Sequence, residues 1–380
     1  MRRIIRFAGS VALLFVVVAL LYGFSILVYN HYIFDSESEM VAWPEASEFS
    51  APRGWKTQHP KRVFVLSIEG GAMHGLAELE VLKALEEKSG KRIYEMFDFV
   101  AGASTGAIIS ALLLHPDSQS DEPMTANEAI DVYTDFAATV LNAPAYHTIL
   151  TANGVYGPVL QNKSRITVAT KLFGDGQFND LLLPTMFPSF SQKSNGLRLF
   201  RNWDKSDANM YLRALVTAVT SAPIYFPAIK LVGNQSEEDY VSDGAMILNA
   251  PGEAAYLHAR THLPEVKDFV IISVGSRRER SIAEQTVADG GLVQWFLPLM
   301  NMVTTGESSV SAHALERHGE FESGVDVQAF FLSPHLPANS NAFDASDQNI
   351  AMIRKAGQDF VKTNDDELEK VIHILTNDGN

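Results

Sequence analysis

Residues 63–75 read VFVLSIEGGAMHG, and this stretch decides the fold. Its first six residues form a short, continuous run rich in β-branched and apolar side chains, which is typical of a strand buried in a parallel sheet. The glycines that follow predict a turn at the end of that strand. Leucines then recur at roughly helical spacing among charged residues from Leu76 to Leu85, and the pattern stops near Gly90. The sequence therefore predicts a strand, a turn and a helix in succession.

A second unit of the same kind follows. The run Phe97–Ala101 leads into Gly102-Ala103-Ser104-Thr105-Gly106, and the small and apolar segment 107–114 after it predicts a buried helix. Two consecutive strand–turn–helix units predict neighbouring parallel strands, with both turns at the carboxyl ends of those strands. We therefore expect the two glycine-bearing turns to face one crevice. A later apolar run, Phe269–Val274, is also predicted to be a strand.

Gly102-x-Ser104-x-Gly106 fits a nucleophile elbow. A sharp strand-to-helix turn needs a residue with almost no side chain on each side of the serine, because neighbouring backbone crowds those positions. This geometry exposes the hydroxyl at a helix N-terminus, whose dipole favours a developing oxyanion. The alternative is a small-residue turn that packs under a helix without chemistry. The position between a buried strand and a buried helix favours the elbow.

The Gly70-Gly71 turn offers backbone N–H groups, which acyl transfer needs to stabilise the oxygen of a tetrahedral intermediate. Its alternative interpretation is the phosphate-binding turn of a nucleotide fold. A dinucleotide site has no need of a serine elbow on the next strand, and no Walker-type Gly-Lys-Ser/Thr follows the glycines. The turn is therefore a candidate oxyanion hole.

A serine nucleophile at neutral pH also needs a base, and Asp243 is the candidate. The segment Tyr240–Ser242 is typical of the end of a strand, and Asp243-Gly244-Ala245 then predicts a sharp turn that holds the carboxylate at a crevice mouth. A plain Asp-Gly turn gives the same pattern, so these residues alone leave both interpretations open.

Three blocks, in this order, resemble those of patatin-like phospholipases: the loop from Glu69 to Gly75, the elbow from Gly102 to Gly106, and Asp243-Gly244-Ala245. The family pattern is a glycine-rich oxyanion loop, a Gly-x-Ser-x-Gly elbow and Asp-Gly-Gly/Ala. The likeness is greatest to the plant-patatin and bacterial branch. Shorter stretches that agree are residues 97–102, 173–175, 180–182, 221–227, 249–251 and 344–349.

The resemblance covers residues 61–380, with its motifs between about 64 and 256. It implies a three-layer α/β/α domain with a largely parallel central sheet. It implies a Ser–Asp dyad in which Ser104 attacks an ester carbonyl and Asp243 takes its proton. It also implies an oxyanion hole made by the amides of Gly70, Gly71 and Ala72, and no metal or organic cofactor.

Two residues depart from the family pattern. Ala72 stands where a third glycine is usual, and His74 stands where an arginine is usual. An alanine at positive φ costs about 1 kcal/mol or more, because its Cβ meets the backbone. A histidine replaces the arginine's permanent cation only when it is protonated.

The first thirty residues predict a membrane anchor. No charged residue occurs from Phe7 to Tyr29, and about 23 residues at 1.5 Å each reach roughly 34 Å, enough for a hydrocarbon core of about 30 Å. Three arginines precede this run, so residues 1–6 are expected in the cytoplasm and the catalytic domain outside it, in the periplasm if the membrane is a bacterial inner membrane. Residues 30–60 are expected to be a linker. A cleaved signal peptide is the alternative.

Composition narrows the function. The net charge is −15 and no block of lysines and arginines occurs, so we expect no nucleic-acid partner. The leading hypothesis is a lipid acyl hydrolase of phospholipase A or lysophospholipase type, with membrane lipid as its substrate. One alternative is an α/β-hydrolase esterase with a Ser–Asp–His triad that uses a late histidine such as His335. The other is a catalytically degenerate lipid-binding relative.

Overall fold

A computed structural model of the chain describes residues 2–29, 38–44, 60–116, 121–233, 238–278, 290–321 and 324–377. The strands are β1 (Glu39–Val41), β2 (Arg62–Ile68), β3 (Phe99–Gly102), β4 (Thr185–Ser191), β5 (Gly196–Arg201), β6 (Ile229–Val232), β7 (Glu238–Asp243), β8 (Asp268–Val274), β9 (Arg277–Arg278), β10 (Asp326–Leu332) and β11 (His335–Leu336). The α-helices are α1 (Arg2–Tyr29), α3 (Gly75–Ser89), α4 (Ile93–Met96), α5 (Thr105–Leu114), α6 (Ala126–Val140), α7 (Ala145–Leu150), α8 (Asn162–Phe173), α9 (Leu212–Val219), α10 (Gly252–His262), α12 (Leu292–Phe321), α13 (Asp347–Thr363) and α14 (Asp365–Asn377). Short 3-10 turns are η2 (Ala72–His74), η3 (Phe178–Asp180) and η4 (Gly244–Met246).

Both predicted strand–turn–helix units are present, as β2 with α3 and β3 with α5. The second strand begins at Phe99, later than predicted, because the preceding Asp98 bonds back to β2. Its Oδ2 accepts a hydrogen bond from the Phe64 amide at 2.8 Å, and its own amide donates to the Phe64 carbonyl at 2.8 Å. This pair of bonds aligns the starts of the two strands.

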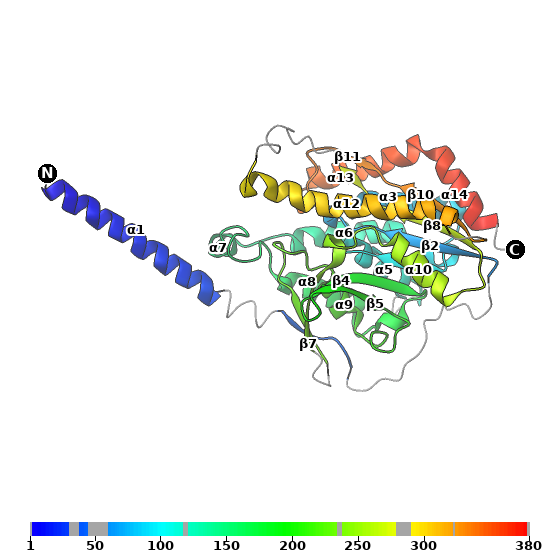
Figure 1. The fold of residues 1–380 in the computed structure, drawn as a ribbon, viewed down its shortest axis with the longest axis horizontal. Helices are drawn as coiled ribbons and strands as arrows, with labels where there is room; N and C mark the ends of the chain where they lie inside the picture. Colours follow the sequence, from blue (N-terminus) through cyan, green and yellow to red (C-terminus); the bar gives the residue numbers. More distant parts are fainter. Residues whose placement is uncertain are drawn as a thin grey trace.

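The central sheet is mostly parallel, as predicted (Figure 1). Its strand order is β1-β6-β7-β4-β3-β2-β8-β10, with β5 paired to β4. Strands β4, β3, β2, β8 and β10 run parallel, while β7 is antiparallel to both β4 and β6. A separate short pair joins β9 to β11 in parallel.

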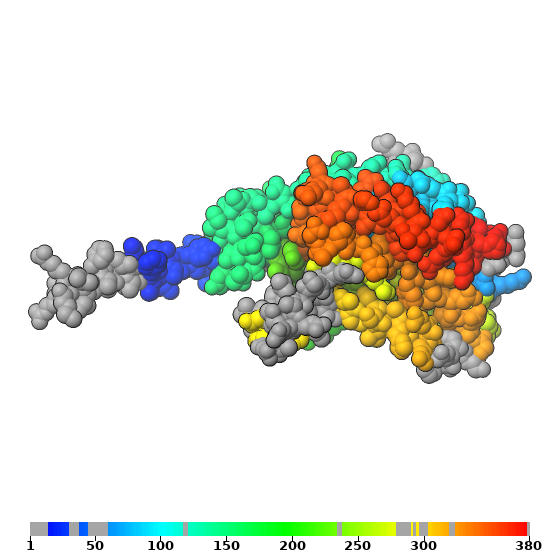
Figure 2. Space-filling model, turned by 90° about the horizontal axis from the view of Figure 1, so that it is seen from above, coloured from blue at the N-terminus to red at the C-terminus, as the bar shows by residue number. Residues whose placement is uncertain are grey.

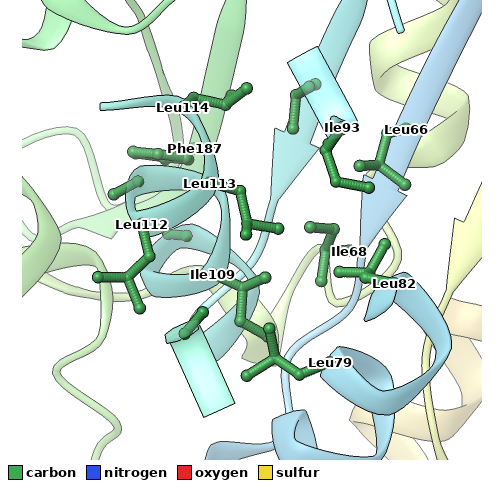
Figure 3. Packing of buried hydrophobic residues seen from close by; sticks show 14 of the residues in the cluster. Leu66, Ile68, Leu79, Leu82, Ile93, Ile109, Leu112, Leu113, Leu114 and Phe187 are labelled. Atoms are coloured by element: carbon green, nitrogen blue, oxygen red, sulfur yellow. The ribbon is translucent and has the colours of Figure 1, made fainter. Parts of the chain in front are cut away.

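Helices cover both faces of this sheet. Alternate residues of β2 point to opposite faces, so Phe64, Leu66 and Ile68 enter one core cluster and Val63 and Val65 the other. The larger cluster lies under α3, α5, α6, α8, α9, α13 and α14, and the smaller one under α10 and α12. Figure 3 shows side chains of α5 and α3 meeting those of β2 in the larger cluster. The two turns that follow β2 and β3 are fixed by this packing.

Strand β7 brings Asp243 to the end of the sheet where the turns after β2 and β3 lie. The register that pairs Val100 with Thr185 makes the residues just after β3 level with Ser189 of β4. Because β7 runs antiparallel to β4, its last residue, Asp243, returns to lie opposite Ser189. A residue 139 positions beyond Ser104 in sequence therefore ends beside it.

The predicted linker, residues 30–60, lies mostly outside the described residues. Within it, β1 pairs in parallel with β6 at the edge of the sheet. Met40 and Ala42 are buried, and the Tyr211 amide donates to the Ala42 carbonyl at 2.7 Å. This part of the segment belongs to the sheet, which the sequence analysis did not predict.

The predicted membrane-spanning helix over residues 7–29 is not supported, and the single-pass topology is wrong. Helix α1 forms there and projects past α7 (Figures 1 and 2), yet among the described residues no helix combines the length and apolarity needed to cross a membrane. The prediction counted the whole apolar run as available to lipid, whereas its last turns contact the rest of the chain. Ile26 is 2% exposed, and the Tyr29 hydroxyl hydrogen-bonds to Nδ1 of His147 in α7 at 2.8 Å. The predicted cytoplasmic placement of residues 1–6 and the predicted extracytoplasmic placement of the domain depended on that helix, so neither is supported.

We predict that Asp98→Ala lowers the free energy of unfolding by about 1–3 kcal/mol, because it leaves the buried Phe64 amide without its acceptor. Urea denaturation followed by circular dichroism measures the change. The control is Asp131→Ala on the exposed face of α6, which should shift the free energy by less than about 0.5 kcal/mol. Equal effects of the two substitutions would contradict this role of Asp98.

Candidate active site

Ser104 occupies a sharp turn between β3 and α5. Its backbone has φ 50° and ψ −118°, a left-handed conformation that side-chain-bearing residues rarely adopt. The flanking glycines are required by close approach. A Cβ on Gly102 would lie 2.3 Å from the Gly106 carbonyl oxygen, and one on Gly106 would lie 2.3 Å from the Ile68 carbonyl oxygen. The turn is therefore pressed directly against the end of β2.

Ser104 and Asp243 are in direct contact. The Ser104 hydroxyl donates to Oδ2 of Asp243 at 2.5 Å, and Oδ1 of Asp243 accepts from the Ala245 amide at 2.8 Å. Asp243 is 2% exposed. Both carboxylate oxygens are thus held, one by the serine and the other by the Asp243-Gly244-Ala245 turn.

Burial raises the pKa of Asp243 from its ordinary value near 4 to about 6. The Ser104 hydroxyl, the Ala245 amide and the cation of Arg165 act in the opposite direction, because each stabilises the carboxylate. At neutral pH the side chain is therefore still mostly ionised and able to accept a proton. A carboxyl with this pKa is a better base than a solvated aspartate.

The glycine-rich loop after β2 faces the same point. The Gly70 amide donates to Oδ1 of Asn249 at 3.2 Å, so it is engaged within the protein. In the described part of the chain, the amides of Gly71 and Ala72 donate to no other protein group. These two N–H groups are available to an oxygen atom in the cavity, whereas the third predicted donor, Gly70, is not in this conformation.

The loop is held from behind. The carbonyl of Ala72 accepts from the Thr105 hydroxyl at 3.0 Å and from the Tyr133 hydroxyl at 2.9 Å, and the Met73 amide donates to the Ala342 carbonyl at 3.0 Å. Ala72 has φ 50°, the left-handed region in which glycine is unstrained. The alanine that departs from the family pattern therefore carries the backbone cost described above.

Acidic side chains that the sequence analysis did not single out lie beneath the loop. Burial and the neighbouring Glu307 raise the pKa of Glu69 to about 7, against the effects of Ser308 and Arg277. Burial and Glu69 also raise the pKa of Glu78, which is fully buried. Glutamates at the end of a strand and on an amphipathic helix are usually solvated, so the pattern gave no sign of their burial.

A cavity of about 730 Å³ opens over Ser104 and Asp243. His74 contributes to its wall beside the glycine-rich loop. The rest of one wall is apolar and comes from α5, α6, the residue directly after α6, and α8: Ile108, Leu112, Val132, Phe136, Val140, Leu141, Val168 and Leu172. A cavity of this size with one apolar wall suits a ligand that has an elongated apolar part. Sequence reasoning did not assign these helices to the site, because their apolar faces look the same as faces that enter a core.

The predicted motif glycines Gly75 and Gly244 support the site from outside it: Gly75 starts α3 beside Thr105, and Gly244 starts η4 against the backbone of Pro188. His335 lines the cavity on β11, where its register partner is Arg277 of β9. The described His, Asp and Glu side chains include no group of three placed to hold a metal ion.

The chain is similar to several known proteins. The family model described as patatin-like phospholipase matches residues 66–256. The chain is 24% identical over 363 residues to patatin-like protein 2 of Oryza sativa subsp. indica, covering 83% of this chain and 88% of that protein. It is 24% identical over 337 residues to Patatin-2-Kuras 1 of Solanum tuberosum, covering 79% and 86%. The solved structure of VipD from Legionella pneumophila aligns with 82% of this chain and 67% of its own, at 14% identity and a TM-score of 0.35.

We predict that Ala72→Gly raises the free energy of unfolding by about 0.5–1 kcal/mol. Relief of the left-handed backbone gains about 1–2 kcal/mol, and the greater freedom of glycine in the unfolded chain takes back about 0.5–1 kcal/mol. Ala138→Gly on the exposed face of α6 is the matched control and should lower the free energy of unfolding by about 0.5–1 kcal/mol. Denaturation curves of the two variants should move in opposite directions, and a shift of both to lower stability would contradict the strain at Ala72.

Proposed function

Because the chain belongs to the patatin-like phospholipase family, we propose that it is a serine lipid acyl hydrolase that cleaves fatty-acyl esters of phospholipids or lysophospholipids. One observation carries the proposal: the contact between Ser104 and Asp243 at the base of a cavity with an apolar wall. Residues 61–380 are proposed to form the hydrolase domain, and the edge strand β1 completes its sheet.

In the first half of the proposed reaction, the Ser104 oxygen attacks the ester carbonyl while its proton passes to Asp243. The carbonyl oxygen becomes an oxyanion, and the Gly71 and Ala72 amides are placed to donate to it. The N-terminus of α5, directly after Ser104, favours the same negative charge. The bond from the acyl carbon to the alcohol oxygen then breaks, and the alcohol leaves with the proton from Asp243, which gives an acyl-enzyme on Ser104.

In the second half, Asp243 accepts a proton from water as the water oxygen attacks the acyl carbon. The bond between the Ser104 oxygen and the acyl carbon breaks, the serine oxygen recovers a proton from Asp243, and the fatty acid is released. The same carboxyl thus acts as base and then acid in each half, for which a pKa of about 6 is suitable.

The acyl chain is proposed to lie along the wall formed by α5, α6 and α8. Each CH₂ group that leaves water for such a wall contributes about 0.8 kcal/mol, so a long chain is bound without a charged contact. Polar side chains such as Asn249 and Ser308 also line the cavity, and they suit the glycerol and headgroup end of a lipid.

We predict that Ser104→Ala abolishes both ester hydrolysis and covalent labelling by a fluorophosphonate, because the chain has no cysteine as an alternative nucleophile. Ser309→Ala serves as a control, since Ser309 is an exposed serine on the same cavity. That control should label at the wild-type rate. Label at an equal rate on Ser104→Ala would place the nucleophile elsewhere.

We predict that Asp243→Asn lowers kcat by about 10²–10⁴-fold, because an amide of nearly the same shape cannot accept the serine proton. His335→Ala should keep wild-type kcat, which separates a Ser–Asp dyad from a Ser–Asp–His triad. Steady-state hydrolysis of a lysophospholipid measures both variants. A loss below tenfold in Asp243→Asn, or a loss of the same size in His335→Ala, would argue for a different base.

A further inference from the structure

Arg165 is an arginine buried beside the proposed base. It lies on α8, is 7% exposed, and contributes to the wall of the cavity that holds Ser104. It belongs to none of the glycine motifs. Among the described residues, no carboxylate lies within ion-pair distance of its guanidinium, and burial lowers the pKa of Arg165 to about 9. A buried cation without a close counter-ion lowers the stability of the folded state, so a functional role for Arg165 is worth considering.

The guanidinium is fixed by four hydrogen bonds to neutral groups. Nη1 donates to the carbonyl of Thr220 at 2.8 Å and to its hydroxyl at 3.1 Å. Nη2 donates to the Ser221 hydroxyl at 2.8 Å and to Oδ1 of Asn162 at 2.6 Å. The plane also lies over the Phe226 ring, with Cζ 3.9 Å from the ring centroid. Arg165 therefore joins α8 to the segment 220–226.

That segment anchors the backbone of Asp243. The Asp243 amide donates to the Ser221 carbonyl at 3.0 Å, and the Ser221 hydroxyl is the group that receives Nη2 of Arg165. Ser221 thus links the Arg165 guanidinium to the backbone of Asp243, through its hydroxyl on one side and its carbonyl on the other. A displacement of Arg165 would be passed to the position of Asp243.

The charge of Arg165 acts on the same carboxylate. Of the described charged side chains, Arg165 is the one whose field acts on the Asp243 pKa, and it favours the ionised form. The other titratable side chains that line the cavity are Glu69, His74, Tyr133, Tyr225, Arg277, Arg278 and His335. None of these is among the causes of the Asp243 shift.

We propose that Arg165 is a positioning residue for the reaction: its positive charge favours the carboxylate form of Asp243, and its hydrogen bonds hold the segment to which Asp243 is anchored. This inference rests on the proposed function of Ser104 and Asp243. It supplies what a two-residue site otherwise lacks, a third group that orients the base and stabilises its working form.

The expected consequence is a change in pH dependence. Activation of Ser104 requires the ionised form of Asp243. The labelling rate is therefore highest above the Asp243 pKa and falls as the pH drops through that pKa. Loss of the Arg165 charge removes a stabilising influence on the carboxylate, which raises that pKa. The acidic midpoint should therefore move upward.

The test measures the second-order rate of fluorophosphonate labelling of the full chain between pH 4.5 and 9. Arg165→Gln should move the midpoint upward from its wild-type position near 6. Arg165→Lys keeps the charge but not the four-bond geometry, so its midpoint should stay at the wild-type value while its rate falls at every pH. Lys171→Gln is the matched control, because it removes a cation from the same helix that lies over Phe136 and not beside Asp243; it should change neither quantity.

An unmoved midpoint in a folded Arg165→Gln, or an equal shift in Lys171→Gln, would overturn the proposal. Thermal unfolding establishes whether Arg165→Gln folds. If it does not, Arg165→Lys decides: an unchanged midpoint with a lower rate supports the proposal, and a raised midpoint or a wild-type rate overturns it. Failure of wild-type protein to label at Ser104 would instead refute the proposed function, so the two failures are distinct.

Discussion

The site depends on one steric constraint, the close approach of the turn after β3 to the end of β2. Gly106 lies so near the Ile68 carbonyl that no Cβ fits between them, and Gly102 lies equally near Gly106. This contact places the serine turn and the glycine-rich loop side by side, before any chemistry is considered. The left-handed backbone of Ser104 is the local cost, and it is held in place by the buried strands and by α5 around it.

Several residues around the site lower the stability of the folded protein. Asp243, Arg165 and Glu78 are buried ionisable groups, and Ala72 adopts a backbone that suits glycine. Each of these lowers stability relative to an apolar or relaxed alternative. They are sustained by the two large apolar clusters on either side of the sheet. A stable scaffold that supports a locally unfavourable arrangement is the usual relation between an enzyme's core and its chemistry.

The parts of the fold that can be predicted from the sequence are those that depend on residues close together in the chain. The run 63–75 and the elbow 102–106 each contain a strand, a turn and the start of a helix, so local pattern is enough. The contact between Ser104 and Asp243 was expected only from the family resemblance, because the two residues are 139 positions apart in the sequence. The role of Arg165 depends on contacts made only after folding. The apolar run of α1 predicted a segment exposed to lipid, because hydropathy cannot reveal the burial of Ile26 or the hydrogen bond between Tyr29 and His147.

Strand β1 has a consequence for how the chain can be shortened. It covers the outer edge of β6, and the Ser38 carbonyl accepts from the Lys230 amide at 2.6 Å. The Ser38 hydroxyl also accepts from Asn162, the residue that holds Arg165. A truncated protein that starts at residue 60 would leave β6 as an open edge, a template for aggregation between molecules, and would loosen the support behind the site. A soluble fragment should therefore keep the chain from before Ser38 onward.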